Sequence, residues 1–308
     1  MIETKLIDYL AEKSEIKNKG LIEKDFIIQS LLASFSKNNY ISKNFVFKGG
    51  TCLVKCYLGY FRFSEDLDFT FINQNSFKNK SEKEIRRLLS AEINELIGII
   101  VDISNVHGLD FKAEKHNKKY VEFGGSNKFL TLKIWYMSSV NKLEQFIKIQ
   151  INFVELFVYK FKKLIAEPLV SVQKKEAEFL FPDYSYILLA KPKLTVYDTR
   201  ELLLEKVRAI LTRREIKARD FVDVFLINKK LNKNIRAFKE GIILKTLFML
   251  KYEKYRENLE EKTNLKEWVK AGQEHYLLLK PLNGFEHFLR ETKLFLNELV
   301  REILRKQV

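Results

Sequence analysis

The sequence predicts an α+β protein with two domains, a mixed-sheet domain over residues 1–185 and a helical domain over residues 186–308. Three observations support this fold class. In the first 185 residues, short apolar runs typical of strands alternate with runs at helical spacing. Beyond residue 185 the apolar residues recur almost only at three- and four-residue steps. The chain has 308 residues, of which 46% are hydrophobic, which is enough for two separate cores.

The first domain is expected to begin with two helices. Apolar residues of positions 3–35 recur at helical spacing, and the sequence NKG at positions 18–20 interrupts them. The period then changes. FVF at positions 45–47 reads as a short buried strand, followed by a Gly-Gly turn and a helix that begins at Thr51. RFSEDLDFTFI at positions 62–72 reads as a second strand.

One long helix and further strands complete this domain. Ser81 and Glu84 form a capping box at the start of an amphipathic helix. Residues 169–183 have a weaker pattern, so the boundary is placed near residue 185. Three alternating segments predict strands of a mixed or antiparallel sheet: YVEFGG at 120–125, FLTLKIWYM at 129–137 and FIKIQINFVELF at 146–157.

The second domain is predicted to be helical. Its clearest segments are TRELLLEKVRAILTRR at 199–214, ARDFVDVFLINKKL at 218–231 and a final helix from residue 285.

The chain is basic. Its 55 Lys and Arg against 40 Asp and Glu give a formal net charge of +15, which concentrates polyanions near the surface. Nucleic acid or nucleotide is therefore the expected partner. The alternative is that the lysines only keep an aromatic-rich chain in solution, because net charge bears on association and solubility rather than on fold.

Cysteine usage and hydropathy predict a cytoplasmic protein that does not span a membrane. The two cysteines, Cys52 and Cys56, lie four residues apart, with no second pair to complete a zinc site, and are expected to be core thiols. The charged start lacks the apolar stretch of a signal peptide, and no apolar run reaches the ~18 residues of a membrane helix.

Asp66 and Asp68 are the first candidate functional residues. Side chains at i and i+2 of a strand project from the same face, so the two carboxylates should lie side by side. Their repulsion is offset when divalent cations bind between them, and Mg²⁺ is typically held by one or two carboxylates plus phosphate oxygens. The pair therefore indicates a metal site for phosphoryl or nucleotidyl transfer. The alternative is a solvent-facing strand that carries two aspartates by chance.

The Gly-Gly-Thr segment strengthens the metal interpretation. Gly49 and Gly50 lie at the start of the predicted helix, where free amide groups and the helix dipole favour an anion, and Thr51 can add a hydroxyl. A strand, this turn, a helix and a strand with Asp-x-Asp would place a triphosphate-binding turn beside the metal site.

With these motifs the sequence resembles the AbiEii/AbiGii-type family of nucleotidyltransferase toxins, whose fold is the polymerase-beta-like nucleotidyltransferase core. The matching segments are Glu23-Lys24-Asp25; Gly49, Gly50 and Thr51 with Leu53; Arg62, Ser64, Asp66 and Asp68; and Lys206 with Asp220 and Asp223.

The resemblance implies residue roles. Asp66 and Asp68 would bind Mg²⁺, and Lys206 and Asp220 would reach the same cleft from the helical domain. For both to reach one site, the helix should be interrupted near residues 212–218. Asp66, Asp68, Lys206 and Asp220 would be catalytic. The nucleotide would be bound by Lys48, Gly49, Gly50, Thr51, Arg62, Ser64 and Lys206. The alternatives are that Lys206 is a surface lysine paired with its neighbours and that Asp223 bonds to Arg219.

One departure affects the expected activity. Polymerase-beta-like enzymes usually bring a third carboxylate from a later strand, whereas this chain has Gln150 and Asn152 at the expected positions. Asp220 can take the role of base, Glu155 can reach in, or the site can bind nucleotide with little turnover.

The resemblance implies a Mg²⁺-dependent toxin that transfers a nucleoside monophosphate from an NTP to an acceptor. The acceptor would be the 3′ end of tRNA, and a cognate antitoxin protein would be the partner. Two alternatives stay open: a catalytically weak nucleotide- or RNA-binding relative, and a transferase that modifies protein hydroxyls.

Overall fold

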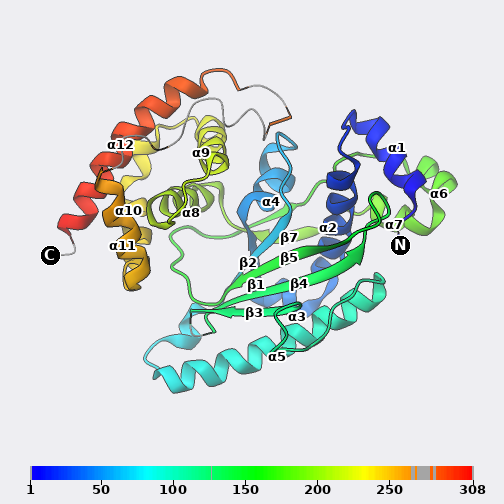
Figure 1. Ribbon diagram of the computed structural model, residues 1–308, viewed down its shortest axis with the longest axis horizontal. Helices are drawn as coiled ribbons and strands as arrows, with labels where there is room; N and C mark the ends of the chain where they lie inside the picture. Colours follow the sequence, from blue (N-terminus) through cyan, green and yellow to red (C-terminus); the bar gives the residue numbers. More distant parts are fainter. Residues whose placement is uncertain (1, 126, 265–267, 269–277, 280–281, 307–308) are drawn as a thin grey trace. The chain divides into compact units, whose positions relative to one another are not determined.

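The computed structural model describes residues 2–125, 127–264, 268, 278–279 and 282–306 (Figure 1). The chain divides into two compact units. The first comprises Met1–Glu155 and Phe161–Val196, and the second comprises Leu156–Lys160 and Tyr197–Val308. The sequence-based boundary at residue 185 precedes the last strand of the first unit, which belongs to its sheet. Among the described residues, none of the helices is both long and apolar enough to cross a membrane.

The first unit is built on one mixed sheet with the strand order β3-β4-β5-β2-β1-β7-β6. β1 pairs antiparallel with β2, whereas β2–β5 and β1–β7 are parallel pairs. This arrangement, with helices around it, confirms the predicted α+β class. The strands are β1 (Phe45–Lys48), β2 (Asp66–Phe71), β3 (Val121–Gly124), β4 (Phe129–Met137), β5 (Glu144–Asn152), β6 (Lys162–Ile165) and β7 (Lys193–Val196).

The predicted helices of the first unit are present, although the helix that was predicted to begin at Thr51 begins at Gly49. The capping box at Ser81 is formed, with the Ser81 hydroxyl and the Glu84 carboxylate each accepting from the other residue's backbone N–H. The helices are α1 (Thr4–Ser14), α2 (Lys19–Lys37), α3 (Asn39–Asn44), α4 (Gly49–Leu53), α5 (Glu82–Val106), α6 (Lys174–Leu180) and α7 (Ser185–Leu188), with a π-helical turn at Val54–Leu58 and 3₁₀ turns at Gln74–Phe77 and Pro182–Tyr184.

The two faces of the sheet differ in chemistry. Leu67, Phe69 and Ile149 project from one face and are buried. Helix α2 packs on this face through Phe35, whose ring lies 5.7 Å from that of Phe69. Next to these residues, Asp66, Asp68, Lys148, Gln150 and Asn152 project from the opposite face, so that face is polar in this part of the sheet.

The second unit is helical, as predicted. Helix α8 ends at Thr212 and α9 begins at Ala218, which confirms the predicted break between these two residues. Its core includes Phe225 and Phe285, whose rings lie 5.4 Å apart. The helices are α8 (Thr199–Thr212), α9 (Ala218–Leu231), α10 (Lys239–Met249), α11 (Glu253–Glu261) and α12 (Phe285–Arg305), with 3₁₀ turns at Ile235–Phe238 and Lys262–Asn264.

Candidate active site

Asp66 and Asp68 share the polar face of β2. Leu67 between them is fully buried, whereas both aspartates are partly exposed. The parallel neighbour β5 places Lys148 opposite Asp66 and Gln150 opposite Asp68. The predicted same-face placement of the two carboxylates is therefore confirmed. Their role as metal ligands stays a prediction.

Gly49 lies directly against Asp68. Its φ of +79° is in the left-handed region, which favours glycine. A Cβ atom at this position would lie 2.0 Å from Asp68 Oδ2, closer than any real contact allows. Lys48, the last residue of β1, is the cross-strand partner of Asp68, so the chain leaves β1 beside this carboxylate. The glycine turn and the aspartate therefore meet, as the order of the motifs predicts.

Gly50 lies against the segment that leads into β2. A Cβ atom on Gly50 would lie 2.6 Å from Arg62 Nη2 and 2.8 Å from Ser64 Oγ. The buried Thr51 hydroxyl donates to the Asp66 carbonyl oxygen at 2.5 Å and lies 3.0 Å from Ser64 Oγ. These contacts bring the two predicted nucleotide-binding motifs together and fix the start of β2 relative to the turn.

Two lysines on strands next to β2 pair with carboxylates in this region. Lys148 Nζ lies 3.2 Å from Asp66 Oδ2. Lys48 Nζ lies 3.8 Å from an oxygen of the buried Glu155, which also accepts a hydrogen bond from Asn152 at 3.0 Å. Sequence reasoning missed Lys148. The signal that could have found it is the alternation Lys148-x-Gln150-x-Asn152, but only together with the parallel register of β5 on β2.

The Glu23-Lys24-Asp25 segment connects helix α2 to three separate parts of the first unit. Glu23 accepts hydrogen bonds from Ser138 and Ser139 in the turn between β4 and β5. Lys24 Nζ lies 2.8 Å from Glu65, the residue before β2. Asp25 pairs with a lysine of the helix that follows the glycine turn. The segment therefore holds the elements around the aspartates in place.

The lysine that pairs with Asp25 is Lys55, which is buried in the π-helical turn after α4. Its Nζ lies 2.9 Å from Asp25 Oδ1 and 3.1 Å from Gln29 Oε1, and it also contacts the Tyr60 hydroxyl. Burial, followed by the charge of Asp25, raises the pKa of Tyr60, so this group stays a neutral donor.

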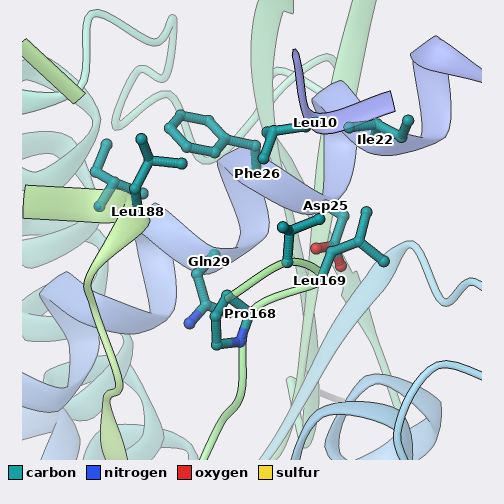
Figure 2. Close-up of a pocket in the computed structure, with 10 residues that line it drawn as sticks. Leu10, Ile22, Asp25, Phe26, Gln29, Pro168, Leu169 and Leu188 are labelled. Carbon is teal, nitrogen blue, oxygen red and sulfur yellow. The ribbon is translucent and has the colours of Figure 1, made fainter. Parts of the chain in front are cut away.

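Figure 2 shows Asp25 and Gln29 beside a small pocket whose other labelled lining residues, which include Leu10, Phe26 and Leu169, are apolar. The pocket holds about 20 Å³, room for about one water molecule, and is too small for a nucleotide.

The second unit contains a cluster formed by Lys206, Asp220 and Asp223. Lys206 Nζ lies 2.9 Å from Asp220 and 2.7 Å from Asp223, and Arg213 lies 2.8 Å from Asp220. Both carboxylates are buried. Burial alone would raise the pKa of Asp220, but the charges of Lys206 and Arg213 outweigh it, so this pKa lies below its usual value. Lys206 of α8 is thus held by two carboxylates of the next helix, α9.

The donor set on β2 fits a hard divalent cation. Carboxylate oxygens on one face suit Mg²⁺, and the missing Cβ of Gly49 leaves room for the Asp68 carboxylate beside the turn. Among the described residues there is no group of three or more His, Cys, Asp or Glu placed to hold an ion.

The fold and the site together are typical of a nucleotidyltransferase: a glycine turn at the end of one strand, paired aspartates on its antiparallel neighbour and a mixed sheet behind both. A family model described as nucleotidyl transferase AbiEii toxin, type IV toxin-antitoxin system, matches residues 30–307. The chain therefore belongs to the AbiEii nucleotidyltransferase toxin family, which confirms the resemblance seen in its motifs.

Two solved structures from Helicobacter pylori are similar to this chain. JHP933 is 15% identical, with 94% of each chain covered and a TM-score of 0.40. A protein described provisionally as a nucleotidyltransferase is 17% identical, with 92% of this chain and 94% of that chain covered and a TM-score of 0.38. Comparison with the curated proteins gives no match.

Proposed function

We propose that this toxin transfers a nucleoside monophosphate from an NTP to the 3′ end of an RNA, with tRNA as the expected acceptor, in a reaction that requires Mg²⁺. The observation that carries the proposal is the contact of Gly49 with Asp68, which brings a backbone turn suited to phosphate next to a carboxylate pair. The net charge of +15 supports a polyanionic acceptor.

Different residues of the first unit would bind the triphosphate and the metal. Lys48, Arg62 and the amides of the glycine turn bind and orient the triphosphate. The acceptor hydroxyl attacks the α-phosphorus, a new phosphorus–oxygen bond forms, and the bond to the β-phosphate oxygen breaks to release pyrophosphate. Asp66 and Asp68 would hold Mg²⁺, which would supply charge neutralisation to the phosphate oxygens.

The roles of Lys206 and Asp220 are also proposals and rest on the motif resemblance. Lys206 would contact triphosphate oxygens as a compact cation. Asp220 would either position Lys206 or accept the proton of the acceptor hydroxyl. The lowered pKa of Asp220 supports the positioning role, because an efficient general base has a pKa near the working pH.

The cognate antitoxin is the expected partner, because the family is one of toxin-antitoxin systems. We further propose that the protein works in the cytoplasm. Both cysteines are free thiols, Cys52 fully buried, which suits a reducing compartment.

Label transfer from α-labelled NTPs to RNA tests the proposal. Asp66→Ala and Asp68→Ala should each lower the rate by at least about a hundredfold, equivalent to about 2.7 kcal/mol of transition-state stabilisation. The matched control is Asp8→Ala, which removes an exposed aspartate that pairs with Lys19 on the neighbouring helix. The variants should keep the thermal unfolding midpoint of the parent protein.

The acceptor is identified in the same assay with purified tRNA, total RNA and protein. Label confined to tRNA 3′ ends supports the proposal. Undiminished transfer in either aspartate variant would contradict the metal role. Mg²⁺-dependent stabilisation by NTPs without any labelled product would instead favour a binding relative, the alternative suggested by Gln150 at the position of a third carboxylate.

A further inference from the structure

A second pocket of the first unit lies on the face of the sheet opposite to the aspartates. It holds about 280 Å³, compared with about 20 Å³ for the small pocket beside Asp25. Tyr136 of β4 lines it. The register of β4, β5 and β2 places Leu132 beside Ile149 and Ile149 beside Leu67, so the even-numbered residues of β4 face away from Asp66. The pocket is therefore separate from the candidate active site.

Four aromatic side chains contribute to the walls of this pocket. Phe26, Tyr136, Tyr184 and Tyr186 all line it, and the rings of Phe26 and Tyr184 meet edge to face at 6.0 Å. Tyr186 is 55% exposed. Ring faces carry partial negative charge, so several rings around one space favour a cation over a neutral guest.

Two carboxylates line the same pocket, Glu23 and Asp183. The described lining residues include no Lys or Arg, in a chain with 55 of these residues against 40 Asp and Glu. His107 also lines the pocket, but burial lowers its pKa, and it stays neutral against Ser34 at 2.8 Å. The lining therefore carries negative charge in an otherwise basic protein.

Glu23 is a buried carboxylate without a basic partner in the described part of the chain. It is 1% exposed and accepts hydrogen bonds only from neutral groups, the Ser138 hydroxyl and the Ser139 hydroxyl and backbone N–H. Asp25, two residues along α2, is instead paired with Lys55 at 2.9 Å. A buried charge that lacks a counterion is costly, so a cation in the adjoining pocket would stabilise Glu23.

We propose that this pocket binds a small organic cation, an alkylammonium or guanidinium group, against the rings of Tyr136, Tyr184 and Tyr186 with its charge balanced by Glu23 and Asp183. The cation can be a free amine or the side chain of a partner peptide, since both present the same group.

The test compares choline with its neutral isostere 3,3-dimethylbutan-1-ol by ligand-observed NMR on the full-length protein. Choline should bind at least about fivefold more tightly, because only choline gains the cation–π and carboxylate interactions. Tyr186→Ala and Asp183→Asn should each weaken choline binding by about two- to thirtyfold. The matched controls are Phe179→Ala for the aromatic variant and Glu178→Gln for the carboxylate variant. Phe179 is 85% exposed, and neither residue lines the pocket.

The source of the cation is tested by displacement of bound choline with spermidine and with N-acetylarginine amide. Displacement by either probe supports the proposal and ranks the free amine against the peptide side chain. Equal binding of choline and its isostere would contradict it, as would unchanged choline binding in both pocket variants or failure of both cations to displace choline. None of these readouts depends on nucleotidyl transfer.

Discussion

The carboxylates of the two units differ in how their charges are matched. On β2 the Asp66 side chain is 29% exposed and pairs with one lysine, Lys148, which is 31% exposed. In the second unit the side chains of Asp220 and Asp223 are 2% and 0% exposed and share Lys206. The first carboxylate faces solvent, whereas the other two lie inside the protein.

This difference predicts how strongly each set of charges contributes to stability. An exposed ion pair contributes little to folding, about 0–1 kcal/mol, so its charges remain available to a ligand. A buried pair is costly to break, because removal of one partner leaves an uncompensated charge. The β2 site is therefore expected to tolerate substitution in stability and the Lys206 cluster is not.

The largest expected effect on stability is that of Lys206→Met. The substitution keeps the apolar stem but leaves Asp223 and Asp220 without their shared cation, so the free energy of unfolding should fall by about 3–5 kcal/mol. Urea denaturation monitored by circular dichroism measures it, with Lys254→Met, an exposed lysine of α11, as the matched control. A loss of less than about 1 kcal/mol would show that the two clusters do not differ in this way.

Gly49→Ala should have the next largest effect. The left-handed φ of +79° and the 2.0 Å approach of Asp68 Oδ2 both oppose a Cβ atom, so we expect a loss of about 1–3 kcal/mol together with a loss of nucleotidyl transfer. The control is Gly98→Ala in α5, where a Cβ meets no atom within 4 Å and alanine should stabilise the helix by about 0.5–1 kcal/mol. Full activity in Gly49→Ala would contradict the proposed role of this turn in binding the triphosphate.

Local patterns predicted most of the elements but not all of their limits. The strand at 45–47, the capping box at Ser81 and the break after Thr212 could be read because each depends on a few adjacent residues. The strand predicted over residues 62–72 forms only over Asp66–Phe71, so it was placed correctly but began too early. The strand predicted over residues 146–157 was too long, because β5 ends at Asn152 and the chain then leaves the sheet. Helix α6 lies in the segment whose pattern was weak, and its exposed Phe179 and Leu180 explain the poor periodicity.

Contacts between distant segments could not be predicted from the sequence. Lys148 lies beside Asp66 only because β5 runs parallel to β2 in one register, and no local pattern sets that register. The motif Glu23-Lys24-Asp25 was visible, but its three partners come from three different parts of the first unit. The sequence therefore indicates which residues matter before it indicates what they contact.

The stability contributed by the Lys206 cluster should also fall at acid pH, but by less than in Lys206→Met. The pKa of Asp220 is lowered in the folded protein, because Lys206 and Arg213 outweigh the effect of burial. A group with a lowered pKa contributes stability above its unfolded pKa, near 4, and loses it as the pH falls through the folded pKa. The free energy of unfolding of Asp220→Asn should therefore fall less steeply below about pH 4 than that of the parent. Parallel pH profiles for both proteins would contradict this prediction.

Lys148→Met should have the smallest effect on stability, a change of less than about 1 kcal/mol, because the Asp66–Lys148 pair is partly exposed and screened. The same substitution should strengthen metal binding rather than weaken it. Removal of the lysine leaves the Asp66 carboxylate without its cation, so in the presence of NTP the protein should bind Mn²⁺, used as a paramagnetic probe for Mg²⁺, more tightly. Water-proton relaxation measures this affinity. Weaker Mn²⁺ binding would show that Lys148 supports the site by holding Asp66 in place. The Asp66–Lys148 pair would then have a structural role, as the buried Lys206 cluster does.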